Sequence, residues 1–243
     1  MSPDKRQHRG AHPADRELFG AERLPVLRRA TAELSWLMSR GYAIVAALKL
    51  VGDRYGLTHR QRLAVSRAAC SNEQRASRAS RCLSIEEAEG KSLIVDGFNL
   101  IITVEAAMSA GLLILARDLC VRDLSSVHGS YRSVEETQSA IGLIGEALEA
   151  IRPASVRWLL DRPVSNSGRL AQRIKEMGEE RGWPWSVETV FNPDNLIQTS
   201  SSVAITSDSV ILDSAPRWLN LNQHLITRYL SDSWLIDLSF EEE

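Results

Sequence analysis

The sequence predicts an α/β protein, in which a domain with a parallel sheet between two helical layers follows a small all-helical domain. After residue 91, short apolar runs alternate with helical stretches, as in a parallel sheet with crossover helices. Residues 24–82 instead show apolar residues at helical spacing and no strand-like alternation. Residues 1–90 carry 16 Lys/Arg against 10 Asp/Glu, and residues 91–243 carry 13 against 21. A basic part therefore precedes an acidic part, an asymmetry that hints at a polyanionic partner.

The domain boundaries follow from composition. Residues 1–23 are charged and lack the apolar core of a signal peptide, so we expect a disordered leader. Residues 24–82 form the arginine-rich helical domain, residues 83–91 a polar linker, and residues 92–243 the α/β domain. No apolar run approaches the roughly 20 residues that span a membrane, and three widely spaced cysteines indicate neither a disulfide framework nor a zinc site. We expect a cytoplasmic protein with no membrane partner, and leave a homo-oligomer open.

Three helices are expected before the arginine-rich end of the helical domain. Pro25 suits the first turn of a helix over residues 24–41. A second helix over residues 42–55 would bury Ile44 on its apolar face. Thr58 is a suitable N-cap for the third helix.

An arginine cluster closes the helical domain, with seven arginines and a single acid between Arg54 and Arg81. On a helix, Arg75, Arg78 and Arg81 would form one stripe because they are three residues apart. Arginine suits phosphate contacts, since its planar guanidinium pairs with two oxygens at once. A solvated face, or a face that docks on the acidic domain, explains the same run of charge. The candidates for nucleic-acid binding are Arg60, Arg67, Arg75, Arg78, Arg81 and Arg122.

The acidic domain alternates strands and helices. Strands are expected over residues 93–96, 112–115, 156–160, 187–191 and 203–206, with helices over residues 134–151 and 168–182. Four of these strands end at, or just before, an aspartate: Asp96, Asp161, Asp194 and Asp208.

These aspartates should meet at one edge of the sheet, because right-handed crossovers keep parallel strands pointing the same way. Close carboxylates repel and raise each other's pKa. Mg²⁺ or Mn²⁺, which prefer oxygen ligands, would relieve that repulsion. Taken singly, each aspartate also suits a turn or a helix N-cap, so the prediction depends on their convergence.

Two motifs carry a resemblance to a known superfamily. Residues 94–101, Ile-Val-Asp-Gly-Phe-Asn-Leu-Ile, resemble the opening strand of PIN-like and NYN-type nucleases, where a hydrophobic strand delivers Asp-Gly-x-Asn to a metal site. Residues 204–209, Ala-Ile-Thr-Ser-Asp-Ser, resemble a later strand of that superfamily, whose Thr/Ser-x-Asp supplies another ligand. With the helical module around residues 36–42, most of the chain resembles an uncharacterised family of two-part proteins that join a helical domain to a PIN-like domain.

The resemblance implies metal-dependent hydrolysis of a phosphodiester, usually in RNA. It implies that Asn99 orients Asp96 or a bound phosphate. Glu105 would supply the superfamily's helix-borne acid, in competition with Asp118, and Asp213 the last carboxylate. Asp161 fits the geometry without matching either motif. The predicted catalytic residues are thus Asp96, Asn99, Glu105 and Asp208, and the predicted metal ligands are Asp96, Asp161, Asp208 and Asp213.

The expected function is that of a PIN-like ribonuclease that uses Mg²⁺ or Mn²⁺ and holds RNA with its arginine-rich domain. The metal would lower the pKa of a bound water and neutralise charge on the phosphate. The alternative is a non-catalytic nucleic-acid-binding or scaffold protein with a degenerate metal site. A third hypothesis, an enzyme acting on a small phosphorylated molecule, would use the same carboxylates and leave the basic helices without a purpose.

Overall fold

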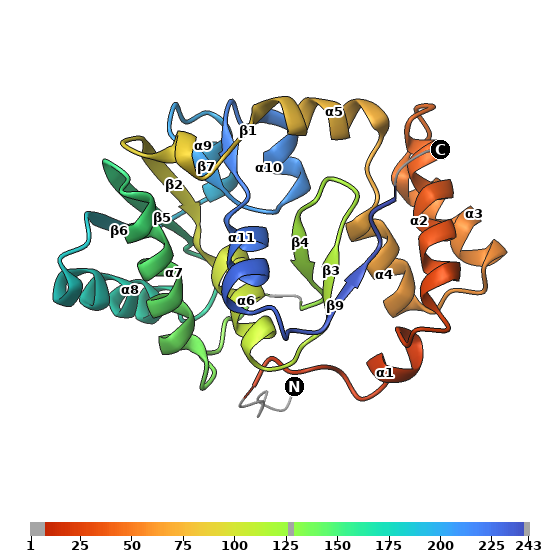
Figure 1. The fold of residues 1–243 in the computed structure, drawn as a ribbon, viewed down its shortest axis with the longest axis horizontal. Helices are drawn as coiled ribbons and strands as arrows, with labels where there is room; N and C mark the ends of the chain where they lie inside the picture. Colours follow the sequence, from red (N-terminus) through yellow and green to blue (C-terminus); the bar gives the residue numbers. More distant parts are fainter. Residues whose placement is uncertain (1–7, 126–128, 241–243) are drawn as a thin grey trace.

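The computed structural model describes residues 8–125 and 129–240, so residues 1–7 of the predicted leader lie outside the described residues. As predicted, an α/β part with a parallel sheet follows an all-helical part (Figure 1). The sheet has six strands in the order β1-β8-β7-β2-β5-β6, and every pairing in it is parallel. Its strands are β1 (Cys82–Leu83), β2 (Ser92–Asp96), β5 (Ser155–Asp161), β6 (Trp185–Val190), β7 (Val203–Ile205) and β8 (Trp218–Leu219).

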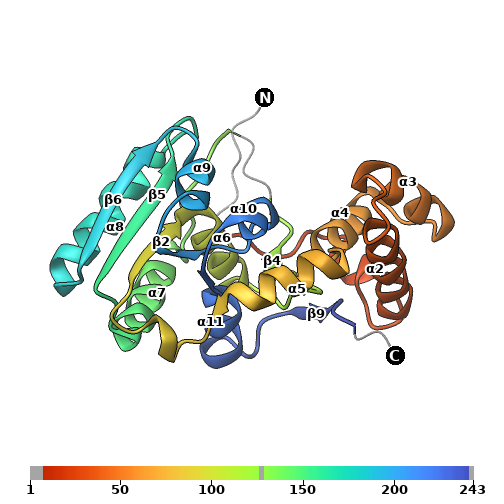
Figure 2. The ribbon, with the colours of Figure 1, turned by 90° about the horizontal axis from the view of Figure 1, so that it is seen from above.

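Helices cover both faces of this sheet, as Figure 2 shows for α9 and α10 on one side and α7 and α11 on the other. Leu93 and Val95 pack into the core on the α7 side, and Ile94 packs into the core on the α10 side. Because side chains alternate along a strand, Asp96 belongs to the same face as Ile94. The covering helices are α6 (Gly97–Met108), α7 (Thr137–Ile151), α8 (Ser167–Arg181), α9 (Pro193–Gln198), α10 (Ser209–Ser214) and α11 (Leu221–Tyr229).

The strand order places β2 at the point where the topology reverses. The chain runs from β2 to β5 and β6 on one side, and then returns to β7 on the other side of β2. Leu93 pairs with Val203, and Val95 with Ile205. Open α/β sheets bind ligands outside the carboxyl ends of their strands at such a reversal. Asp96 and the segment that follows β7 therefore lie together at the place where this fold accommodates a ligand.

The helical part contains the predicted helices, namely α2 (Leu24–Met38), α3 (Ile44–Arg54), α4 (His59–Ala68) and α5 (Asn72–Arg81). Thr58 caps α4 as predicted, in a capping box with Gln61. Ile44 differs from the expectation, because its side chain is 40% exposed at the first turn of α3 instead of buried.

A second, smaller sheet was not predicted. It consists of β3 (Leu113–Leu115), β4 (Val121–Asp123) and β9 (Leu235–Asp237), with β3 antiparallel to β4 and parallel to β9. The run over residues 112–115 therefore lies outside the main sheet. Only a short turn separates β3 from β4, so these two strands pair antiparallel, because a parallel pair of consecutive strands needs a crossover of a dozen or more residues. Ile114 and Ile236 of this sheet share one apolar core with Leu27 and Leu34 of α2.

The predicted leader and linker both have defined structure where the structure describes them. Residues 8–23 include α1 (Asp15–Leu18), and Phe19 is 1% exposed in the core of the helical part. The linker begins with Leu83, which pairs with Leu219 as an edge of the main sheet, and continues into a 3₁₀ turn, Glu86–Ala88. The expectation of disorder for residues 8–23 was wrong because their charged side chains have partners far away in the sequence. None of the described helices is long and apolar enough to cross a membrane.

Candidate active site

Asp96 ends β2 and begins α6. Its carboxylate accepts a hydrogen bond from the backbone N–H of Asn99 at 3.4 Å, so it acts as the N-cap of the helix. Gly97 follows because the chain passes close to β5 here. A Cβ atom at Gly97 would lie 2.6 Å from Cδ2 of Leu160 and 3.0 Å from the carbonyl oxygen of Leu159. The Asp-Gly pair is thus explained by the turn itself: the aspartate caps the helix and the glycine lets the helix approach the sheet.

Thr206 connects Asp96 to Asp208. Its hydroxyl donates to Oδ2 of Asp96 at 2.9 Å and accepts from the backbone N–H of Asp208 at 3.0 Å. Asp208 in turn caps α10 by accepting from the N–H groups of Val210 and Ile211. The two motifs that the sequence analysis selected therefore meet through one threonine, which was not among the predicted site residues. The Thr-x-Asp spacing was the signal that could have identified it.

Four aspartates lie close enough to repel one another. Burial, together with the charges of Asp208 and Asp194, raises the pKa of Asp96 to about 7 against the opposing hydrogen bond from Thr206. Burial also raises the pKa of Asp194, and the charges of Asp208 and Asp161 add to this effect. The acids expected at the carboxyl edge thus share one electrostatic environment. Asp194, which was named with them but left out of the predicted ligand set, belongs to the group.

The donor chemistry of this edge suits a hard divalent cation, because carboxylate oxygens with unbalanced negative charge are its preferred ligands. Within residues 8–125 and 129–240, none of the four aspartates forms an ion pair with a basic side chain. In the same part of the chain, no three His, Cys, Asp or Glu side chains are arranged to hold a metal ion. The edge therefore offers negative charge and oxygen atoms without a preformed ligand cluster.

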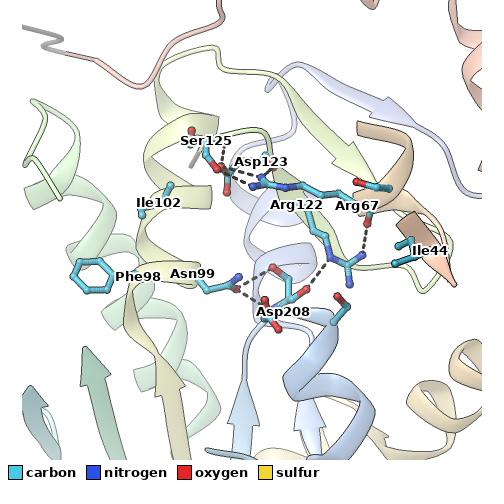
Figure 3. A pocket seen from close by; sticks show the side chains of 12 residues that line it. Ile44, Arg67, Phe98, Asn99, Ile102, Arg122, Asp123, Ser125 and Asp208 are labelled. Atoms are coloured by element: carbon cyan, nitrogen blue, oxygen red, sulfur yellow. Dashed lines mark hydrogen bonds and ion pairs between the residues drawn. The ribbon is translucent and has the colours of Figure 1, made fainter. Parts of the chain in front are cut away.

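Asn99 fixes the loop between β7 and α10. Its Oδ1 accepts from the backbone N–H of Ser207 at 2.8 Å and from the Ser207 hydroxyl at 2.9 Å (Figure 3). Asn99 was predicted to orient Asp96 or a phosphate. The structure shows that its backbone N–H contacts Asp96, while its side chain holds Ser207.

Glu105 does not join this group. It lies eight residues after the start of α6, or about 12 Å along the helix axis at 1.5 Å per residue. Its buried carboxylate accepts from Tyr131 Oη at 2.6 Å and Thr137 Oγ1 at 2.5 Å, and it forms an ion pair with Arg9. The structure therefore assigns Glu105 to a buried cluster that anchors the segment containing Arg9, in contrast to the predicted catalytic role.

Asp118 and Asp213 are also placed elsewhere, and both contact Arg78. Asp213 accepts from Gln74 and from Arg78 Nε, each at 2.8 Å. Asp118 accepts from Arg78 Nη1 at 2.6 Å and, with both oxygens, from Arg122. These cations hold the pKa of Asp118 well below its usual range against the effect of burial. Asp213, predicted as a metal ligand, and Asp118, the alternative to Glu105, are therefore both bound to arginine instead.

The predicted arginine stripe is mostly an interface between the two parts of the chain. Arg78 is 2% exposed and bonded to acids of the α/β part, so an RNA phosphate cannot reach it while the parts stay together. Arg81 donates to the carbonyl oxygens of Leu212 and Ala215 at α10. The alternative in which the arginine face docks on the acidic domain is therefore correct for α5. Net charge alone could not distinguish this docking from RNA binding.

The other candidate arginines differ in their surroundings. Arg60 pairs with the buried Asp15 of α1. Arg122 is buried, and besides Asp118 it donates to the carbonyl oxygens of Ser207 and Arg67. In the part of the chain that the structure describes, Arg75 forms no ion pair. Arg67 lines a cavity next to Asp208 together with Arg122, and its side chain is the more exposed of the two, at 28% against 9%.

This cavity has a volume of about 400 Å³ and lies where the helical part meets the carboxyl edge of the sheet (Figure 3). Residues of both parts line it, among them Ile44, Arg67, Phe98, Asn99, Arg122 and Asp208. Asp208, the one edge aspartate in the described lining, thus borders a space that neither part encloses alone.

Comparison with known proteins identifies a two-part family. The family described as "Domain of unknown function (DUF5616)" matches residues 85–224. The chain belongs to this family. The DUF5616 region follows a match of residues 26–81 to "Protein of unknown function (DUF434)". "Uncharacterized protein MJ0935" of Methanocaldococcus jannaschii is 32% identical over 188 residues, which cover 77% of this chain and 89% of that protein. No solved structure matches the chain. The predicted two-part organisation is therefore confirmed.

Proposed function

We propose that this DUF434–DUF5616 protein is a nuclease that hydrolyses phosphodiester bonds in RNA with Mg²⁺ or Mn²⁺. One observation carries the proposal: Asp96, at the end of the central strand, has its pKa raised to about 7 by burial and by neighbouring acids. Buried like charges destabilise a fold unless something compensates them. A strongly perturbed acid at the ligand-binding edge of an α/β sheet is a candidate functional group.

Each residue at the edge has a definable part in such a reaction. Oxygens of Asp96 and Asp208 would hold the cation, which supplies an acidified water and neutralises charge on the phosphate. Thr206 fixes the orientation of the Asp96 carboxylate through its hydroxyl. The side-chain N–H₂ of Asn99 has no protein partner among the described residues, and Asn99 lines the cavity. That group is positioned to donate to a phosphate oxygen.

The substitution Asp96→Asn tests the proposal. Asparagine keeps an oxygen that accepts from the backbone N–H of Asn99 and removes the charge, while its N–H₂ faces Thr206 Oγ1 as a donor in place of the second carboxylate oxygen. We expect Mn²⁺ binding, measured by titration calorimetry, to fall at least tenfold, and Mn²⁺-dependent cleavage of a labelled single-stranded RNA to fall at least a hundredfold. Mn²⁺ affinity equal to that of the wild type would overturn the metal site.

Asp213→Asn is the matched control, because Asp213 was also predicted as a ligand and lies with Gln74 and Arg78 instead. It should leave Mn²⁺ affinity unchanged.

The lack of a preformed metal cluster in the described residues favours one other function, a non-catalytic RNA-binding protein. RNA binding without Mn²⁺-dependent cleavage in the wild-type protein would establish that alternative.

A further inference from the structure

The cavity between the two parts of the chain combines three kinds of surface. Asn99 and Asp208 bring it into contact with the candidate active site. Arg67, which reaches it from α4, supplies positive charge. Phe98, Ile102 and Ile44 supply apolar surface, the first two from α6 and the third from α3 (Figure 3).

Arg67 is the cation that can meet a ligand here. Arg122 also lines the cavity, but its guanidinium is bound to both oxygens of Asp118 and to two backbone carbonyls. Arg67 is held in place by the carbonyl oxygens of Asp123 and Ser125, and it forms a long ion pair, at 3.9 Å, with the carboxylate of Asp123. Its side chain is 28% exposed, so it is both positioned and accessible.

The dimensions of the cavity restrict its ligand. A volume of about 400 Å³ lies near the lower end of the range of small-molecule pockets. This volume matches one nucleotide and is too small to enclose a duplex. Proteins that recognise single-stranded RNA take up unstacked bases against aromatic or apolar side chains and hold the backbone with cations. Phe98 and Ile102 on one wall and Arg67 on the other offer these two surfaces.

We propose that this cavity binds one unpaired nucleotide of a single-stranded RNA, with a phosphate between Arg67 and Asp208 and the base against Phe98 and Ile102. The choice of RNA rests on the proposed function. The helical part thereby forms one wall of the substrate site and selects single strands over duplexes.

Two neighbouring residues of α3 provide a sharp test. Ile44 lines the cavity, whereas Val45, 80% exposed, does not. Glutamate is tolerated in the first turn of a helix, so Ile44→Glu and Val45→Glu should both fold. Binding of a fluorescent eight-nucleotide single-stranded RNA is measured by anisotropy in EDTA and 150 mM salt. At this salt concentration, screening confines the electrostatic effect of the new glutamate to nearby groups. We expect Ile44→Glu to weaken binding about tenfold and Val45→Glu to change it less than twofold.

Arg67→Gln is the second variant. It should weaken binding and reduce the slope of log affinity against log salt by about 0.7, the effect of one lost phosphate contact on a single strand. The cavity is not the RNA site if Ile44→Glu and Val45→Glu weaken binding equally. The same conclusion follows if the protein binds a blunt RNA duplex as tightly as the single strand. Tighter binding of single-stranded DNA of the same sequence would overturn RNA as the ligand.

Because binding is measured in EDTA, it is separate from cleavage. If Asp96-dependent cleavage occurs while Ile44→Glu binds normally, the nuclease proposal stands and the cavity proposal fails. If binding depends on Ile44 in a protein that does not cleave RNA, the cavity proposal stands and the nuclease proposal fails.

Discussion

At the scale of single residues, two effects act on Asp96 in opposite directions, one from its place in α6 and one from the neighbouring acids. It caps α6, which favours an acceptor oxygen at this position, and it lies among other acids, which disfavours its charge. Thr206 reduces the conflict by donating to the carboxylate. Ionisation of Asp96 therefore costs stability, and a strongly perturbed acid of this kind is a candidate functional group.

This conflict predicts how stability depends on pH in EDTA. A free aspartate has a pKa of 3.8 and folded Asp96 one of about 7, so between these values the folded state binds more protons than the unfolded state. The contribution of Asp96 to stability therefore falls as the pH rises from 3.8 to 7, and its full penalty remains above 7. Asp96→Asn should raise the free energy of unfolding at pH 8 by up to about 4 kcal/mol in urea titrations. The gain should shrink towards pH 4, and an equal gain at both pH values would contradict this account.

The sequence predicted Asp96 and Asp208 because each stands at the end of an apolar strand. It could not predict their connection, since the hydrogen bond from Thr206 to Asp96 spans 110 residues and depends on the pairing of β2 with β7. Glu105 shows the opposite case. Its place near the motif favoured a catalytic role, but its partners Arg9 and Tyr131 become visible only in the folded chain.

At the scale of elements, α5 is held to the α/β part by a buried ionic contact. Arg78 joins Asp118 and Asp213, and burial makes the loss of one partner expensive because a charge stays behind unpaired. Arg78→Met should lower the free energy of unfolding by about 3 kcal/mol in urea titrations. Arg75→Met, one turn earlier on the same helix, makes the same chemical change at a residue without an ion pair in the described structure, and should shift stability by at most about 0.5 kcal/mol. Similar losses in both variants would show that the helix, and not the buried contact, is sensitive.

Elements with their own local signals were predicted well. α2, α4 and α7 show apolar spacing with caps or stops in the sequence, and these signals act over a few residues. The strands β1 and β8 contain two residues each, too few for a pattern, and exist because neighbouring strands complete their hydrogen bonds. A strand over residues 112–115 was expected, but the sheet of β3, β4 and β9 was missed because β9 joins it from the far end of the chain.

At the scale of the whole molecule, the two family regions are distinct in sequence but share a core. Leu27 and Leu34 of α2 pack in the same cluster as Ile114 of β3 and Ile236 of β9. Unfolding of the small sheet should therefore remove support from the helices, although they belong to the other region. This arrangement predicts that the helical part has little independent stability.

Ile236→Ala tests that prediction. Truncation of this buried side chain should cost about 2–4 kcal/mol, and the amides of α2 and α4 should lose hydrogen-exchange protection together with those of β9. Val210→Ala, at a side chain that is 63% exposed on α10, should change neither quantity. Unchanged protection in α2 and α4 while β9 becomes unprotected would show that the helical part is independent.

The position of β9 also governs the order in which the protein can assemble during synthesis. Arg28 of α2 donates to the carbonyl oxygen of Asp237, a contact between residues 209 positions apart. Domains generally fold from the N-terminus as the chain emerges from the ribosome. Here the earliest helices cannot cover their apolar face until Ile236 and Leu238 have been made. Throughout translation of the α/β part, the helical part therefore presents an incomplete core to chaperones and to other chains.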